Sequence, residues 1–168
     1  MMARAHPEFA LRPFLIEDTP LLTEIFRASI AELTGDDYTE GQQEAWASAA
    51  DDEEAFAKRL GDQLTLLVTM NGSPVGFASL ANNESIDLIY VHPAVAGQGA
   101  GTMLVGALGK LAAARGAKRL TAEVSDSAQD FFRKRGFTAQ QRNTMLRGGE
   151  WLANTTMDKP LATGQGAA

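Results

Sequence analysis

A chain of 168 residues and 17.9 kDa has the size of one globular domain, and its 45% hydrophobic and 21% charged residues exclude a disordered protein. The absence of cysteine excludes disulfides, thiolate chemistry and cysteine-based zinc sites, and a net charge of −6 argues against general binding to nucleic acid or anionic membranes. Residues 1–8 lack the apolar core of a secretory signal, and no apolar run reaches the ~20 residues of a spanning helix, so we expect a cytoplasmic protein with one domain over residues 1–168.

The N-terminal part of the chain predicts a strand followed by an amphipathic helix. Residues 9–14 are mostly apolar and contain a proline near their end, which is typical of a short edge strand. Asp18 or Thr19 is placed to cap a helix that has Pro20 in its first turn. Apolar residues then recur at helical spacing until Gly35, so we expect one face of this helix to be buried.

Two shorter helices are predicted next, over residues 39–48 and 51–60. Tyr38 and Trp46 stand out in this region because aromatic residues make up only 7% of the chain. Two interpretations stay open for them. They are either wedges beneath a short helix, or they wall an acceptor pocket beside the glycine-rich loop that follows later in the chain.

An antiparallel meander of three strands is predicted in the middle of the chain, over residues 64–70, 74–80 and 85–91. The first strand is rich in β-forming residues, and Asn71-Gly72, the strongest short hairpin signal, separates it from the second.

A glycine-rich loop leads from the third strand into a helix over residues 99–115. His92 and Pro93 end the strand, and His92 is interpreted as a turn residue rather than as a base or cofactor contact. Three glycines then make the loop flexible: Gly97, Gly99 and Gly101. A strand, a glycine loop and a helix in this order present free backbone N–H groups at a helix N-terminus, which favours an anion.

The remaining elements complete one sheet. Residues 119–124 predict a strand parallel to residues 85–91, joined to it by a right-handed crossover. A short helix should follow, with Asp126 and Gln129 at capping-box spacing and Gly136 at its end.

The chain is then predicted to end in a hairpin of residues 137–146 and 150–158 that turns at Gly148-Gly149. Residues 161–168 are expected to form a loose tail.

Spacing and charge narrow the identity of the anion. A dinucleotide fingerprint starting at Gly97 or Gly99 needs glycine where the chain has Thr102 or Leu104, and a P-loop also needs glycine at position 104. The 46 residues from 17 to 62 contain thirteen acids, whereas residues 91–120 contain none. An otherwise acidic protein has therefore kept acids away from the loop, as expected for a polyanion site.

Two stretches resemble motifs of the GNAT superfamily of N-acetyltransferases. Residues 91–101, Val-His-Pro-Ala-Val-Ala-Gly-Gln-Gly-Ala-Gly, resemble its acetyl-CoA pyrophosphate loop, and residues 125–137 resemble its A-x-x-F-Y-x-x-x-G-F helix. The resemblance extends over about residues 9–160, taken as the ordered core. It implies an α/β (α+β) fold with a mixed, mostly antiparallel sheet of six or seven strands, a splayed central parallel pair and flanking helices.

The same resemblance implies that acetyl-CoA is the cofactor, with CoA as product. No metal is expected, because no His, Asp or Glu cluster has metal-binding spacing. The cofactor would be held by the backbone of the strand before the loop, by the loop amides and by the later helix. The implied cofactor-binding residues are Leu88, Ile89, Tyr90, Val91, Ala96, Gly97, Gln98, Gly99, Ala100, Gly101, Thr102, Ser127, Phe131 and Phe132. Two positions depart from the family. Ala96 stands where arginine or glutamine is usual, so Gln98 or a basic residue elsewhere is expected to compensate. Phe132 replaces the tyrosine that protonates the leaving thiolate in many members.

Acyl transfer to an amine needs a proton acceptor, and Glu84 and Asp87 are the predicted carboxylates. For Asp87, a strand position that faces solvent or pairs with a cation is the open alternative. Tyr90 is the candidate proton donor in place of the missing tyrosine. Regular alternation would put Asp87 and Tyr90 on opposite faces of the strand, unless the bulge usual in the family resets it.

Ser125 and Ser127 are candidate hydrogen-bond donors near the thiol, or helix caps.

The sequence therefore predicts an acetyl-CoA-dependent N-acetyltransferase acting on a primary amine of a small-molecule or peptide acceptor, by direct transfer in a ternary complex. Acids on the N-terminal helices favour a cationic acceptor. Nucleic acid and membranes are not expected partners, and a monomer or homodimer is expected. The alternatives are a non-catalytic acyl-CoA-binding or sensing module and, disfavoured by loop spacing, a nucleotide-binding domain.

Overall fold

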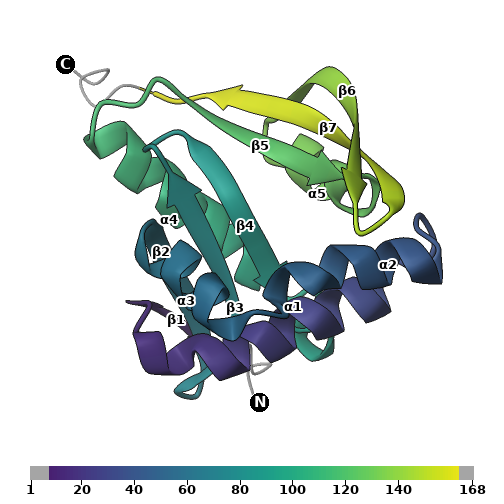
Figure 1. Cartoon of the computed structure of the whole chain (residues 1–168). Helices are drawn as coiled ribbons and strands as arrows, with labels where there is room; N and C mark the ends of the chain where they lie inside the picture. The colour runs from purple at the N-terminus through teal and green to yellow at the C-terminus, as the bar shows by residue number, and fades with distance from the viewer. Residues whose placement is uncertain (1–7, 163–168) are drawn as a thin grey trace, which may run out of the picture.

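The computed structural model describes residues 8–162, so the first seven residues and residues 163–168 of the predicted tail lie outside it. One mixed sheet organises these residues, with the strand order β1-β2-β3-β4-β5-β7-β6 (Figure 1). The strands are β1 Phe9–Pro13, β2 Leu64–Met70, β3 Ser73–Ala81, β4 Ser85–Val91, β5 Arg119–Ser125, β6 Thr138–Arg147 and β7 Glu150–Pro160. The β4–β5 pair is parallel and the other neighbours are antiparallel, which confirms the predicted mixed sheet.

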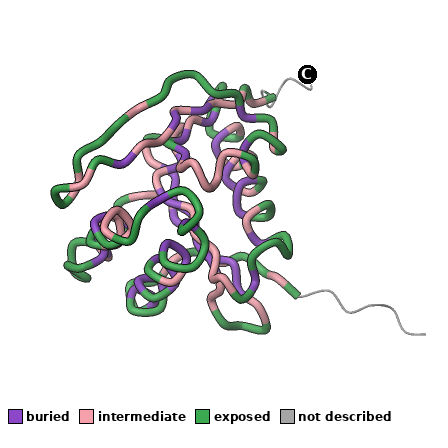
Figure 2. Tube along the Cα trace, turned by 90° about the vertical axis from the view of Figure 1, so that its right-hand side faces the viewer, coloured by how far each residue is buried: buried purple, intermediate pink, exposed green. Residues whose placement is uncertain are grey.

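Helices cover both faces of the sheet. The first three are α1 Thr19–Leu33, α2 Glu40–Ala47 and α3 Glu53–Gly61, and the last two are α4 Ala100–Ala114 and α5 Gln129–Lys134. One apolar core joins α1 and α3 to the sheet through Phe77 and Leu88, and a second core joins α4 and α5 to the opposite face. The buried residues follow the interior strands and the inward sides of the helices (Figure 2).

The central parallel pair is short. Only Ser85 and Ile86 of β4 are in register with β5, opposite Thr121 and Ala122. The Ser85 and Thr121 hydroxyls lie 2.8 Å apart, and the Thr121 N–H donates to the Glu84 carbonyl at 2.8 Å. Beyond Ile86 the two strands diverge, so the β5-facing edge of β4 has no partner strand there (Figure 1).

A bulge on β4 sets the direction of its side chains. Ser79 of β3 is opposite Leu88 and Leu80 is opposite Ile86, which leaves Asp87 as the extra residue. Asp87 and Leu88 both face the α1–α3 side, because Asp87 binds a side chain of α3 and Leu88 lies in that core. The regular alternation considered for this strand is therefore wrong, and the bulge resets it.

Local turn signals are confirmed at several positions. Asn71 and Gly72 have φ values of 52° and 87°, as the predicted hairpin requires. Gly116, with φ 93°, follows α4, which ends at Ala114 with Arg115 as its cap.

Two sequence expectations fail through tertiary contacts. The Asp126–Gln129 capping box is absent, because the Asp126 carboxylate binds Arg142 of β6 while Gln129 donates to Thr155 of β7. Leu161 is not part of a loose tail: its N–H donates to the Lys118 carbonyl at 2.8 Å, and its side chain packs against the α4 core.

Phe77 tests the core beneath the divergent strands. Its side chain is fully buried and lies 6.4 Å from Phe56 and 5.9 Å from Tyr90 between ring centroids. We expect Phe77→Ala to lower the free energy of unfolding by about 3–5 kcal/mol in urea titrations, because the surrounding side chains cannot fully close the cavity that the lost ring leaves. Leu146→Ala, at a side chain 60% exposed, is the control and should change it by less than about 0.5 kcal/mol. A loss below about 1 kcal/mol for Phe77→Ala would contradict this packing.

Candidate functional site

The glycine loop is a set of free backbone donors. Gly97 and Gly99 have φ values of 78° and 103°, a region that side chains disfavour. The N–H groups of Gly97 and of residues 99–102 make no hydrogen bond to a backbone or side-chain acceptor within residues 8–162. His92 is a turn residue, as interpreted from the sequence, since its Nδ1 accepts from the Ala94 N–H at 3.0 Å. The loop therefore fits an anionic group at the start of α4.

Helix α5 packs directly on this loop. A Cβ at Gly101 would lie 3.0 Å from two atoms of the Phe131 ring, so any larger residue there would push the ring away from the loop. The Arg135 guanidinium lies 3.7 Å from the centroid of the same ring and donates to the Thr102 hydroxyl and, at 2.7 Å, to the Phe131 carbonyl. No carboxylate within residues 8–162 lies within 4.0 Å of Arg135. The loop thus has a cation at its edge that the sequence motifs did not indicate.

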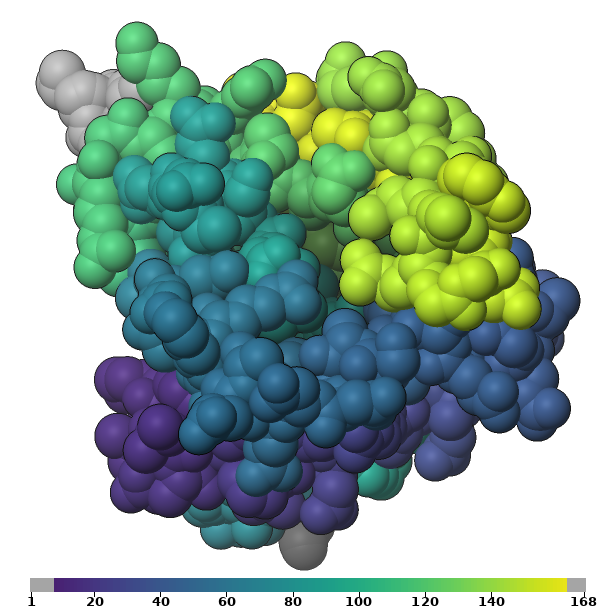
Figure 3. All heavy atoms as spheres, in the orientation of Figure 1, coloured from purple at the N-terminus to yellow at the C-terminus, as the bar shows by residue number. Residues whose placement is uncertain are grey.

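Two cavities adjoin the gap between β4 and β5. The larger has a volume of about 440 Å³ and lies toward α1–α3 and the β6–β7 hairpin, where the surface is hollowed (Figure 3). The smaller, about 250 Å³, reaches Ser127, Phe131 and Phe132. Several residues line both cavities: Trp46, Ile86, Asp87, Tyr90, Ala122, Glu123 and Ser125. The smaller cavity thus extends from α1 to α5, and it meets the larger cavity at the gap between β4 and β5.

Tyr90 places a hydroxyl at this connection. The hydroxyl accepts a hydrogen bond from Trp46 Nε1 at 3.1 Å, and no acceptor for its own proton is found in the described residues. Burial raises the pKa of Tyr90 to about 12, against a smaller lowering by the Trp46 hydrogen bond. The phenol is therefore protonated at neutral pH and has a proton to donate. Phe132 lies buried between Phe131 and Phe137 and offers none.

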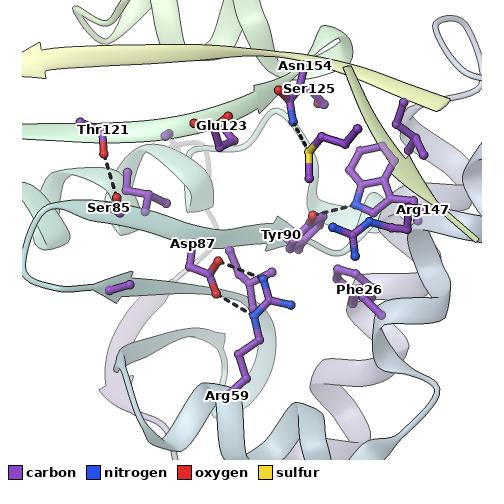
Figure 4. Close-up of a pocket in the computed structure, with 18 of the residues that line it drawn as sticks. Phe26, Arg59, Ser85, Asp87, Tyr90, Thr121, Glu123, Ser125, Arg147 and Asn154 are labelled. Carbon is purple, nitrogen blue, oxygen red and sulfur yellow. Dashed lines mark hydrogen bonds and ion pairs between the residues drawn. The ribbon is translucent and has the colours of Figure 1, made fainter. Parts of the chain in front are cut away.

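Asp87 reaches the connection but is already paired (Figure 4). Its two oxygens accept from Arg59 at 2.7 and 2.9 Å, and Gln63 donates to one of them at 2.9 Å. Burial would raise the pKa of Asp87, but the hydrogen bonds from Arg59 and Gln63 and the charge of Arg59 outweigh it, so the pKa is lowered. The ion pair with Arg59 matches the alternative left open by the sequence, in which Asp87 pairs with a neighbouring cation.

The structure separates Glu84 from Asp87. Glu84 lines neither cavity, and its carboxylate lies 3.6 Å from Arg119. Of the two predicted carboxylates, only Asp87 therefore lines the cavities, and a catalytic role for either stays a prediction.

Glu123 is the carboxylate that sequence reasoning missed. It lies on β5 between buried Ala122 and Val124, so it faces away from the α4 core and lines both cavities. Its oxygens accept from Asn143 at 2.9 Å and from Thr156 at 2.9 Å, and no cation lies within 4.0 Å among residues 8–162. Polar and apolar side chains alternate along residues 119–124, and this alternation could have placed Glu123 on the face opposite the apolar Leu120, Ala122 and Val124.

Tyr38 and Trp46 combine both interpretations offered for them. The Tyr38 hydroxyl donates to the Ala153 carbonyl at 2.6 Å and accepts from the Asp126 N–H at 2.9 Å, so it joins α1–α2 to the β7 region. Both aromatic residues also line the larger cavity. That cavity is not beside the glycine loop as expected, since no residue of 96–102 lines it. Whether Tyr38 and Trp46 contact an acceptor stays a prediction.

The two serines have different surroundings. Ser125 lines both cavities and its hydroxyl makes no cap, whereas the Ser127 hydroxyl donates to Asp37 at 2.8 Å and lines the smaller cavity.

No group of three or more His, Asp or Glu side chains within residues 8–162 is arranged to hold a metal ion. None of the helices in this part of the chain is long and apolar enough to cross a membrane.

Known proteins share this chain's sequence and fold. The acetyltransferase (GNAT) domain family matches residues 34–160. A crystal structure of a GCN5-related N-acetyltransferase from Rhodopseudomonas palustris, also named a class-II aminotransferase, is 58% identical with a TM-score of 0.90, over 96% of this chain and 99% of that one. YafP, an uncharacterized N-acetyltransferase of Escherichia coli (strain K12), is 28% identical over 148 residues, 88% of this chain and 93% of YafP.

More distant structures share the fold. The PaiA N-acetyltransferase of Thermoplasma acidophilum, solved in complex with coenzyme A, is 19% identical with a TM-score of 0.77, over 91% of this chain and 99% of that one. Structures with this fold thus bind CoA or acetyl-CoA. With three quarters of its length matched by the family and a sheet that splays at β4 and β5, the chain belongs to the GNAT superfamily of N-acetyltransferases.

Proposed function

We propose that this protein moves the acetyl group of acetyl-CoA to a primary amine of a small-molecule or peptide acceptor, by direct transfer in a ternary complex. The observation that carries the proposal is that two cavities share residues across the gap between β4 and β5. Two substrates entering from opposite sides would meet there. No cysteine is present to form a thioester with the acetyl group, which is consistent with direct transfer.

The loop and α5 are the proposed CoA-binding elements. The free amides of Gly97 and residues 99–102 would bind the pyrophosphate, and the unpaired edge of β4 would bind the pantetheine arm. Arg135 is proposed to take the place of the arginine or glutamine that position 96 lacks. Three of its five N–H groups are used by Thr102 and Phe131, which leaves two for a phosphate.

Glu123 is the proposed proton acceptor for the amine. A carboxylate whose charge is not balanced by a cation can attract an ammonium group and take its proton. Asp87 remains the second candidate, but its oxygens are bound by Arg59 and Gln63. Tyr90 is proposed to donate its free O–H to the leaving thiolate, in place of the tyrosine absent at position 132.

Calorimetry and a thiol-release assay test the proposed function. CoA and acetyl-CoA should bind at micromolar concentrations and ATP should not, and an amine library should include acceptors that release free thiol from acetyl-CoA. A protein that does not bind CoA overturns the proposal. Binding without thiol release from any amine would favour the acyl-CoA-binding module instead.

Glu123→Gln tests the proton acceptor. We expect kcat to fall by about 100-fold or more, and to recover in part as pH rises toward the pKa of the amine, because less ammonium then needs deprotonation. Thiol-release rates of purified variants measure this. Glu84→Gln is the control and should keep the wild-type rate, since Glu84 lines neither cavity. A wild-type rate for Glu123→Gln with a large loss for Asp87→Asn would assign the role to Asp87.

Asp87→Asn tests the ion pair with Arg59. Because the folded protein lowers the pKa of Asp87, the carboxylate stabilises the fold above about pH 4, and this contribution is lost as pH falls through the lowered pKa. The pair is partly exposed, so we expect a loss of about 1 kcal/mol in unfolding free energy at pH 7 that shrinks toward pH 3. Asp62→Asn, in the more exposed pair with Lys58, should show a smaller loss. A loss for Asp87→Asn that does not change with pH would contradict this assignment.

Arg135→Ala tests the cofactor contact. Loss of a charged hydrogen bond to phosphate should raise the dissociation constant of CoA about tenfold, measured by calorimetry without any acceptor present. Arg133→Ala is the matched control, because Arg133 lies in the last turn of α5, two residues before Arg135, and pairs with Asp130 instead of the loop. Equal CoA affinities for the two variants would remove Arg135 from the site.

A further inference from the structure

Arg147 is a cation without a partner in the larger cavity. It is the last residue of β6, it is half-buried, and its side chain points into the cavity near Tyr90 (Figure 4). Its guanidinium has no hydrogen bond and no carboxylate within 4.0 Å among residues 8–162. The other arginine of the cavity, Arg59, is neutralised by Asp87.

This arrangement is unusual among the arginines of the described residues. Only Arg115 and Arg147 have no side-chain partner there, and Arg115 is exposed on the surface. A partly desolvated guanidinium without an anion is unfavourable, whereas a bidentate contact with a carboxylate matches its geometry. Arg147 is therefore available to an anionic group that enters the cavity.

The other residues of the cavity indicate which kind of molecule carries the anionic group. Apolar and aromatic side chains form part of the wall, among them Phe26, Trp46 and Leu152. Glu123 lies at the connection between the two cavities and has no cation beside it. The cavity thus offers a carboxylate where the acetyl group would arrive, a guanidinium at Arg147, and apolar surface as well.

Building on the proposed function, we infer that the acceptor is an amino acid or a similar amine that carries its own carboxylate, with an apolar side chain. Its amine would lie at Glu123 and its carboxylate at Arg147. The expectation of a cationic acceptor was based on the acids of residues 17–62, and none of these acids lines either cavity. The charges that do line the larger cavity include as many basic as acidic side chains.

Matched ligands test this inference in the CoA-saturated protein. The probes are the common L-amino acids with apolar side chains, each compared with its carboxamide and its decarboxylated amine where these exist. We expect at least one acid to bind at least about tenfold more tightly than its amide, measured by calorimetry or tryptophan fluorescence. It should also be acetylated with a correspondingly higher kcat/KM.

Variants of Arg147 test whether this residue causes the preference for the acid over its amide. Arg147→Gln should abolish the difference between acid and amide, Arg147→Lys should keep part of it because the charge remains, and Arg115→Gln should leave it unchanged. The comparison of acid with amide in the wild-type protein needs no variant, so a misfolded Arg147→Gln would not remove the test.

The outcomes separate this inference from the proposed function. If no acid of the panel binds or reacts better than its amide, or if the preference persists in Arg147→Gln, the inference is wrong. If thiol release is equally fast with neutral amines, the proposed acetyl transfer stands while the inference fails. If acetyl-CoA itself does not bind, it is the proposed function that fails.

Discussion

Two residue pairs hold β4 and β5 together, and the site depends on where that pairing stops. Ser85 and Ile86 are in register with β5, and from Asp87 onward β4 has no neighbour on that side. A strand edge inside a sheet normally satisfies its backbone groups by pairing. The divergence of β4 from β5 therefore leaves unpaired backbone groups on β4 and a gap between the two strands. The two cavities adjoin each other at this gap.

The second constraint is which charges satisfy one another inside the protein. The bulge directs Asp87 toward α3, where Arg59 binds both of its oxygens. Asp87 then acts as an internal counter-ion, and its pKa is lowered. Glu123 and Arg147 have no such partner in the described residues, so their charges are free to act on a ligand. Internal pairing thus separates the groups that support the cavity from those proposed to recognise a substrate.

Most of the fold was predictable because its signals are local. Residues 64–70 and 85–91 were predicted as strands with the bounds that β2 and β4 have, and Asn71-Gly72 forms the expected hairpin turn. The failures have tertiary causes. The capping box failed because Arg142, sixteen residues away from Asp126, competes for its carboxylate. The choice between regular alternation and a bulge along β4 stayed open, because a bulge depends on the register of the neighbouring strand.

The sequence by itself determined the glycine-rich loop and the two positions that depart from the family motifs, because glycine backbone geometry and side-chain chemistry are properties of the residues present. Gly97 and Gly99 adopt positive φ, and neither Ala96 nor Phe132 has a polar side chain. The tertiary structure alone decided which charged groups face the gap and which of them are neutralised. Arg59 and Asp87 are 28 residues apart, and Arg147 reaches the cavity from a hairpin at the far edge of the sheet. Such pairings follow from strand order and register, which no local pattern encodes.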